Sequence, residues 1–214
     1  MLENFEIKAI TELDLSKYPD FCIWDGSIVR TKMLSVIWEL SKDNEINILD
    51  IGCGTAQMWS QFLKNMPNVS LYGFDTGDKS LSIAKKNLEG LKANISKGSI
   101  SSLNKIFSEI KKFDFIVSHS VLEHVVPRHL FFSSINRRLS ENGLGLISWG
   151  SDHFRQGTKT DIRNYVSRLL AKLKIENYYT LEVDEIWARK EIENAGLKIH
   201  LLHYYSLVEL KKLL

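Results

Sequence analysis

The sequence predicts a doubly wound α/β fold, in which a mostly parallel β-sheet carries helices on both faces. Short apolar runs alternate with stretches of helical periodicity over residues 46–150. The spacing leaves room for a helix between successive strands, as parallel strands require. Repeats and linkers rich in Pro or Gly are absent, so the 214 residues are expected to form a single domain, 1–214.

The elements follow in order along the chain. Ser27 is a candidate cap for an N-terminal helix, a strand covers 46–51, and a helix that begins at Gln57 stops before Pro67. Further strands are expected at 69–75, 93–97, 113–118, 144–149 and 197–204. Further helices are expected at 78–89, 103–110, 127–139, 158–173, 184–195 and 206–214. The helix at 158–173 is an insertion after the fifth strand.

Composition limits the possible partners. With 28 basic and 26 acidic residues the net charge is +2, which gives no large field to attract nucleic acid or an anionic membrane. The acidic start lacks the apolar segment of a signal peptide, and no uncharged apolar stretch approaches the ~20 residues of a membrane span. Cys22 and Cys53 form no metal or disulfide framework. We therefore expect a cytoplasmic protein with no metal site, no nucleic-acid partner and no membrane partner.

The most informative segment is Asp50-Ile-Gly52-Cys53-Gly54, between the first strand and its helix. Glycines allow a ligand to approach bare backbone, and a helix start offers unpaired N–H groups. In such sheets, ligands lie beyond the carboxyl ends of the strands. A dinucleotide fingerprint would have a third glycine where Gln57 stands, which argues against NAD.

This D-x-G-x-G segment resembles the first motif of the class I S-adenosylmethionine (SAM)-dependent methyltransferases. Phe113–Val125, which contains a Val-Leu-Glu-His stretch, is similar to the fourth-strand segment of the small-molecule members, and Asn142-Gly143 before a glycine-containing strand matches the segment after it. The resemblance covers residues 46–150. It implies the Rossmann-like class I methyltransferase fold, with SAM as cofactor and S-adenosylhomocysteine as product.

The resemblance also implies a cofactor site. Asp75 stands where the family places an acid on the ribose hydroxyls, whereas Ser99 replaces the acid near the adenine. Arg30 is either a partner of the SAM carboxylate or an ordinary surface arginine. The expected cofactor-binding residues are Asp50, Gly52, Cys53, Gly54, Asp75, Thr76, Ser99, Ile100, His119 and Arg30. Residues 1–45 would form a helical lid, 46–150 the SAM-binding core, and 151–214 the acceptor-side cap with the rest of the sheet.

Two histidines are candidates for catalysis. His153 follows the fifth strand and is a possible general base, a surface residue or a substrate contact. His119, at the end of the fourth strand, is the second candidate, with lining of the cofactor pocket as its favoured role. We expect His124, in the Val-Leu-Glu-His stretch, to be structural.

The predicted function is methyl transfer from SAM to an oxygen or nitrogen of a small molecule, by a monomer or a homodimer. Two alternatives remain: a nucleotide-binding oxidoreductase with a degenerate fingerprint, and a non-catalytic module that binds SAM or a partner. One departure from the family concerns its seventh, antiparallel strand. Because the C-terminal segment has helical periodicity, that strand is either missing or lies in 175–183.

Overall fold

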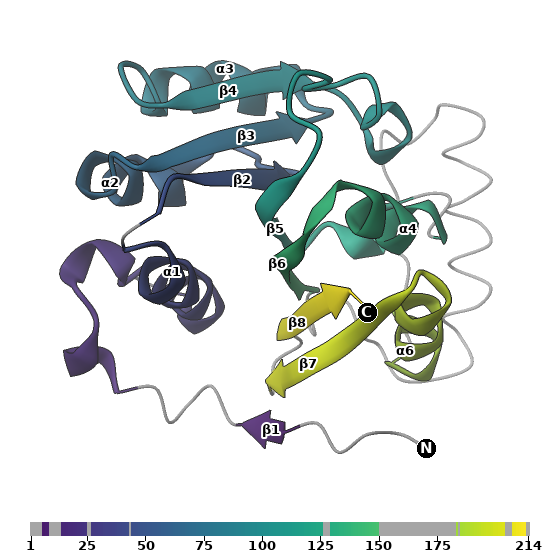
Figure 1. Ribbon diagram of the computed structural model, residues 1–214. Coiled ribbons are helices and arrows are strands. Elements are labelled where there is room, and N and C mark those ends of the chain that lie inside the picture. Colours follow the sequence, from purple (N-terminus) through teal and green to yellow (C-terminus); the bar gives the residue numbers. More distant parts are fainter. Residues whose placement is uncertain are drawn as a thin grey trace, which may run out of the picture.

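A computed structural model describes residues 6–8, 14–24, 27–42, 44–125, 129–149, 183, 185–203 and 207–212. Within these residues, eight strands form one sheet in the order β1-β7-β8-β6-β5-β2-β3-β4 (Figure 1). The strands are β1 Glu6–Lys8, β2 Ile46–Ile51, β3 Val69–Asp75, β4 Ala93–Lys97, β5 Phe113–His119, β6 Leu139–Ser148, β7 Leu197–His203 and β8 Leu207–Lys212. The α-helices are α1 Ile28–Ser41, α2 Gln57–Asn65, α3 Asp78–Asn87, α4 His129–Arg138 and α6 Glu185–Asn194.

The pairing of the strands confirms the doubly wound prediction. Strand β2 is parallel to both β3 and β5, and β4 and β6 continue the parallel sheet on either side. Only β8, among the strands described, runs antiparallel to its neighbours, β6 and β7. The carboxyl ends of β2, β3 and β5 therefore meet at one edge of the sheet, where the sequence places its glycine turn and its candidate acids.

Helices cover the two faces of the sheet as two layers (Figure 1). Helices α1, α2 and α3 pack on one face, and α4 and α6 pack on the other. Successive residues of a strand point to opposite faces, so Ile48 lies in the first core and Leu49 in the second. Both faces are buried, which explains why the adjacent residues Ile48 and Leu49 of β2 are both apolar although they face opposite sides of the sheet.

Local signals set several helix boundaries as predicted. The Ser27 hydroxyl accepts a hydrogen bond from the Arg30 backbone N–H at 3.3 Å, which caps the start of α1. Helix α2 ends at Asn65, two residues before Pro67. These two helices lie before and after strand β2 and its glycine turn.

The prediction for the C-terminus was wrong. Residues 207–212 form strand β8, whereas the sequence indicated a helix over 206–214. The strand lies between β6 and β7 and pairs with both, and this pairing outweighs the helical spacing of its apolar residues. The family's antiparallel strand is therefore present. The alternative strand at 175–183 and the inserted helix at 158–173 lie outside the described residues, apart from Val183.

Two further boundaries differ from the sequence prediction. Residues 103–109 form turns after a short 3-10 helix, Ile100–Ser102, although their apolar spacing indicated a helix. Phe107 takes a left-handed φ of 53°, which a helix cannot contain. Strand β6 begins at Leu139, so the predicted Asn142-Gly143 turn lies inside the strand, where its register against β5 is irregular.

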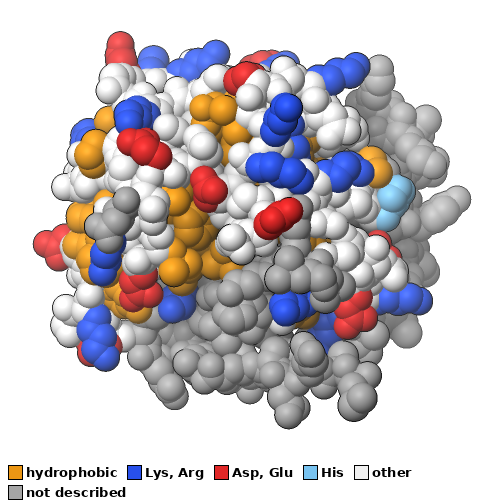
Figure 2. Space-filling view, viewed as in Figure 1, with side chains coloured by type: hydrophobic (Ala, Val, Ile, Leu, Met, Phe, Trp, Pro, Cys, Tyr) orange, Lys and Arg blue, Asp and Glu red, His pale blue; other side chains and the backbone are white. Residues whose placement is uncertain are grey.

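The surface carries both signs of charge. On the face shown in Figure 2, Lys and Arg side chains are interspersed with Asp and Glu side chains. None of the helices in the described part of the chain is both long and apolar enough to span a bilayer.

Candidate functional site

The glycine turn after β2 has a tightly fixed backbone. Gly52, Gly54 and Ala56 all have left-handed φ values, of 73°, 55° and 50°. The backbone N–H groups of Gly52 and Cys53 both donate to the Phe74 carbonyl of β3, at 2.9 and 3.0 Å. A Cβ on Gly52 would collide with the Val121 side chain, whereas a Cβ on Gly54 would meet nothing within 4 Å. The turn is therefore pressed against protein at Gly52 and faces open space at Gly54.

Asp75 connects this turn to the end of β3. Its Oδ2 accepts a hydrogen bond from the Gly54 N–H at 2.9 Å, and its Oδ1 accepts one from the Gly77 N–H at 2.8 Å. Each carboxylate oxygen can accept more than one hydrogen bond, so both oxygens keep capacity for a ligand hydroxyl. Asp75 thus holds the turn in shape and also presents a carboxylate beside it.

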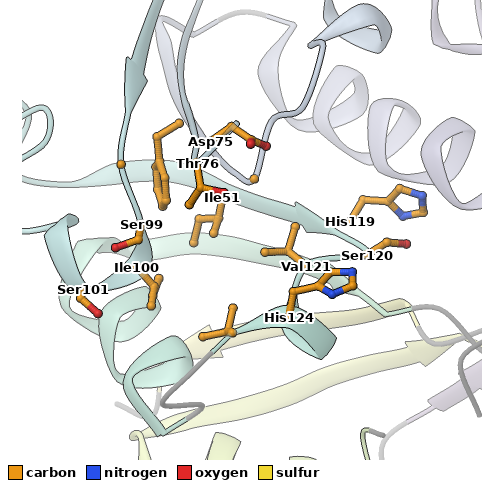
Figure 3. Close-up of a pocket in the computed structure, with 14 residues that line it drawn as sticks. Ile51, Asp75, Thr76, Ser99, Ile100, Ser101, His119, Ser120, Val121 and His124 are labelled. Atoms are coloured by element: carbon orange, nitrogen blue, oxygen red, sulfur yellow. The ribbon is translucent and has the colours of Figure 1, made fainter. Parts of the chain in front are cut away.

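A cavity of about 640 Å³ opens beyond the carboxyl ends of β2, β3, β4 and β5 (Figure 3). Its volume falls in the range of roughly 300–1,000 Å³ that is usual for small-molecule sites. Six of the predicted site residues line it: Gly52, Asp75, Thr76, Ser99, Ile100 and His119. Asp50, Cys53, Gly54 and Arg30 do not line it, and His153 lies outside the described residues.

Asp50 lies beneath the turn and is only 4% exposed. Its Oδ2 accepts a hydrogen bond of 2.6 Å from the indole Nε1 of Trp59, in the first turn of α2. Burial raises the pKa of the Asp50 carboxyl to about 7, although the Trp59 hydrogen bond and the Arg30 charge act to lower it. Asp50 therefore changes charge near neutral pH without contacting the cavity.

Arg30 belongs to the first turn of α1, close enough to Asp50 and His119 to act on the pKa of both. Its guanidinium lies 5.5 Å from the centre of the Trp24 ring, and its buried Nε has no hydrogen-bond partner in the described structure. A buried guanidinium nitrogen without a partner is costly, which favours a ligand group such as a carboxylate at this position.

His119 ends β5 and is hydrogen-bonded to β6. Its Nδ1 lies 2.6 Å from the Ser148 hydroxyl. Burial, followed by the Arg30 charge, lowers the pKa of His119 to about 4. The imidazole is therefore neutral at neutral pH, and it lines the cavity in that form.

The segment after β5 contributes more to the cavity than the sequence indicated. Ser120, Val121, His124 and Val125 all line it, together with Ile51, Phe74, Gly98 and Ser101 from the neighbouring strands and loops. Ser120 takes a left-handed φ of 55° and donates its N–H to the Ser148 carbonyl at 3.0 Å, which turns the chain across the strand ends. Figure 3 labels both Ser120 and His124 among the side chains that line this cavity. The prediction that His124 is structural did not include its place in the cavity lining. Its position in the Val-Leu-Glu-His stretch, which resembles a family segment, was the feature of the sequence that could have indicated this place.

Among the residues that the structure describes, no group of three or more His, Cys, Asp or Glu side chains is arranged to hold a metal ion. The lining of the cavity supplies one carboxylate, hydroxyl groups and two imidazole rings beside the glycine turn. Together with the doubly wound sheet, these features define an α/β domain that binds a small polar cofactor.

Comparisons with known proteins identify the family. A methyltransferase domain family matches residues 42–191, which is most of the chain. A malonyl-[acyl-carrier protein] O-methyltransferase from Halalkalibacterium halodurans is 29% identical over 116 residues, covering 53% of this chain and 43% of that protein. A release factor glutamine methyltransferase from Flavobacterium psychrophilum is 26% identical over 169 residues, covering 75% and 56%. The chain thus spans about half the length of these curated relatives.

The fold comparison agrees with the family match. A TehB-like SAM-dependent methyltransferase from Corynebacterium glutamicum superimposes with a TM-score of 0.57 at 18% identity, over 84% of this chain and 86% of that one. The chain belongs to the class I SAM-dependent methyltransferase family. The prediction of this family, its fold and its cofactor is confirmed.

The residues present fit SAM. The open space at Gly54 leaves a cradle that a side chain would fill, which suits a ligand held against backbone. Asp75 offers a carboxylate for a pair of hydroxyls, and Arg30 has a buried guanidinium nitrogen with no described partner. The Ser99 segment supplies neutral groups to the same cavity.

Proposed function

We propose that this chain transfers the methyl group of SAM to an oxygen or nitrogen of a small molecule, and that the cavity of about 640 Å³ is where SAM binds. The observation that carries this proposal is the glycine turn, which Asp75, a residue of the cavity lining, fixes by a hydrogen bond. The N-terminal segment with α1 would act as a lid over the cofactor.

In this proposal, residues of the site would bind each part of SAM. The Asp75 carboxylate would accept hydrogen bonds from the ribose hydroxyls, and the turn Gly52–Gly54 would hold the methionine end against its backbone. Arg30 pairs with the carboxylate of the methionine end, which would satisfy its buried Nε. The segments around Ile100 and Val121, whose apolar side chains line the cavity, would hold the adenine.

The chain's contribution to the reaction is alignment and charge. SAM supplies an electrophilic methyl group on a sulfonium. The site aligns that methyl with the acceptor, an effect worth several kcal/mol in such displacements. His119 stays neutral because burial lowers its pKa to about 4, so it adds no repelling charge near the sulfonium. A histidine of such low basicity would serve as a hydrogen-bond partner for the acceptor.

The acceptor atom in this proposal is an oxygen or a nitrogen. The relative from Halalkalibacterium halodurans is an O-methyltransferase, and the one from Flavobacterium psychrophilum is a glutamine methyltransferase, so both acceptor atoms occur among similar proteins. We infer a small-molecule acceptor from the Val-Leu-Glu-His stretch, which is similar to that of small-molecule members of the family.

Isothermal titration with SAM, S-adenosylhomocysteine and NAD tests the cofactor. We expect binding of the first two and none of NAD. Binding of NAD without SAM would support the oxidoreductase alternative instead. A metabolite screen with methyl-labelled SAM then separates an enzyme from a non-catalytic module, because a module binds SAM and labels no acceptor.

His153 remains our proposed general base. The variant His153→Asn keeps a polar side chain but cannot accept the proton. Turnover of an identified acceptor should fall by about 10²–10⁴-fold while SAM affinity stays unchanged. A loss of less than about tenfold would exclude this role and favour catalysis by alignment alone.

A further inference from the structure

A buried pair of side chains lies under the glycine turn, outside the set that lines the cavity. The Trp59 indole donates to the Asp50 carboxyl at 2.6 Å, and the two residues are 0% and 4% exposed. Asp50 stands two positions before Gly52, at the end of β2, whereas Trp59 belongs to α2. The hydrogen bond therefore joins the strand and the helix that the glycine turn connects.

Packing alone does not explain this pair. The Trp59 ring does contact Phe62 edge-on, with ring centres 5.9 Å apart, but a phenylalanine would also pack there. What the indole adds is one N–H donor, aimed at a carboxyl that is removed from water. A buried carboxyl is costly unless something offsets its charge or holds its proton.

The charges around Asp50 come from two other elements. Arg30 on α1 favours the ionised carboxyl, and Asp75 at the end of β3 disfavours it. Burial is the largest influence and raises the pKa of Asp50 to about 7, while the Trp59 hydrogen bond acts to lower it. Near neutral pH the Asp50 carboxyl is thus partly protonated and partly ionised, and a nearby cation would increase the ionised fraction.

We propose that Trp59 is a positioning residue: it holds the Asp50 carboxylate beneath the glycine turn as the counter-ion for the cationic methionine end of SAM. The inference rests on the proposed function, because it assumes that the methionine end lies along this turn. Asp50 acts through the field across the turn and does not touch the cofactor. Arg30 and SAM then share one buried negative charge.

The pair should make cofactor binding depend on pH. SAM carries a sulfonium and an ammonium, so it binds better when Asp50 is ionised, and its affinity rises with pH as the carboxyl loses its proton. The variant Trp59→Phe keeps the ring and removes the donor that favours the ionised form. Its Asp50 carboxyl should therefore ionise at a higher pH, and the rise in affinity should move to a higher pH with it.

The first experiment needs no cofactor. The indole ¹⁵N–¹H signal of Trp59, assigned by its loss in Trp59→Phe, is followed by NMR between pH 5.5 and 8.5. We expect this signal to titrate with a midpoint near the pKa of about 7 that burial gives Asp50. The control is the indole of Trp38, which lies 3.7 Å from the Lys42 ammonium and should not titrate in this range. A flat Trp59 signal would overturn the proposal.

The second experiment measures SAM affinity by calorimetry at pH 6 and pH 8. The ammonium of SAM itself loses its proton near pH 8, so the variant Asp50→Asn, which has no carboxyl there, supplies the baseline. Relative to that baseline, the wild-type affinity should rise by about five-fold, the effect expected when a bound cation lowers a pKa by about one unit.

The variant Trp59→Phe should shift this rise to higher pH, and the matched variant Trp38→Phe should leave it in place. A Trp59→Phe protein that binds SAM more weakly by the same factor at every pH would show a merely structural role and overturn the proposal. If Trp59→Phe does not fold, the Trp59 indole signal is assigned instead as the one whose titration disappears in Asp50→Asn, and the wild-type titration and Asp50→Asn still decide. Absence of SAM binding at any pH would instead refute the proposed function, whatever the NMR midpoint is.

Discussion

Gly52 and Gly54 lie two residues apart in one turn, yet the structure limits substitution at the two positions in different ways. At Gly52 an added Cβ meets the Val121 side chain, so the position is closed by the protein itself. At Gly54 an added Cβ meets open space, so only the left-handed φ of 55° opposes a side chain. A ligand that presses against the turn would be the missing neighbour.

This difference predicts separate effects of alanine at the two positions. Gly52→Ala should lower the free energy of unfolding by about 2–4 kcal/mol, because it adds a collision to the backbone strain. Gly54→Ala should cost only about 1–2 kcal/mol of stability. It should nevertheless weaken SAM binding at least tenfold, since the methyl group would occupy the cofactor's space.

Gly90 provides a matched control for Gly54. It also has a positive φ, of 76°, and open space around its missing Cβ, but it lies in the loop after α3. Gly90→Ala should therefore cost similar stability and leave SAM affinity unchanged. Urea unfolding and calorimetry on the three variants measure both quantities. Equal SAM affinity in Gly54→Ala and Gly90→Ala would mean that the turn does not approach the cofactor.

The sequence predicts the positions of some site residues and not of others. Asp75 and Thr76 were predictable because a strand that ends in an acid fixes where its next residues lie. Ser120 and His124 were not, because they reach the cavity through a left-handed residue and a 3-10 turn after β5. Arg30 depends on how α1 packs beside the sheet edge, which periodicity within α1 does not specify.

Secondary-structure elements were predictable where burial left a clear pattern. The strands at 46–51, 69–75 and 93–97 were predicted with the bounds that the structure has. The helix predicted at 103–110 was wrong. The Phe107 carbonyl accepts a hydrogen bond of 2.9 Å from Arg138 of α4, so a residue distant in the sequence holds this segment in a turn. Strand β8 was predicted as a helix because its apolar residues have helical spacing, and its pairing with β6 and β7 overrides that local preference.

The position of β8 leads to a prediction for its backbone. Val208 pairs with Ile147 of β6 on one side and Leu202 of β7 on the other. Val208→Pro removes a backbone donor from an interior strand and should lower the free energy of unfolding by about 3 kcal/mol or more. Val208→Ala, which keeps that donor, is the matched control and should cost much less. A Pro variant as stable as the Ala variant would place this segment outside the sheet.

At the scale of the whole molecule, the sheet brings together groups that are far apart in the sequence. Arg30, Asp50 and His119 come from α1, β2 and β5, and Arg30 influences the pKa of both other groups. Burial disfavours the charged form of both groups, so it moves their pKa values in opposite directions: it raises that of Asp50 to about 7 and lowers that of His119 to about 4. Both groups are consequently held toward their neutral forms.

These two shifts have opposite effects on stability between pH 4.5 and 6.5. His119 has a lower pKa folded than unfolded, so the unfolded chain takes up its proton first, and stability is lost as pH falls. Asp50 has a higher pKa folded than unfolded, so the folded protein takes up the proton first, and stability is gained as pH falls. In the wild type the two effects largely offset each other.

Removing either group should expose the effect of the other. In Asp50→Asn, His119 is the one of these two groups that still titrates. The free energy of unfolding should therefore fall by about 2 kcal/mol from pH 6.5 to pH 4.5, relative to wild type. In His119→Asn only Asp50 titrates, and the same step in pH should raise it by a similar amount. Urea unfolding at the two pH values measures this difference, and the other titrating groups cancel because all three proteins share them. Changes of the same sign in both variants would contradict the opposite shifts that burial imposes on the two groups.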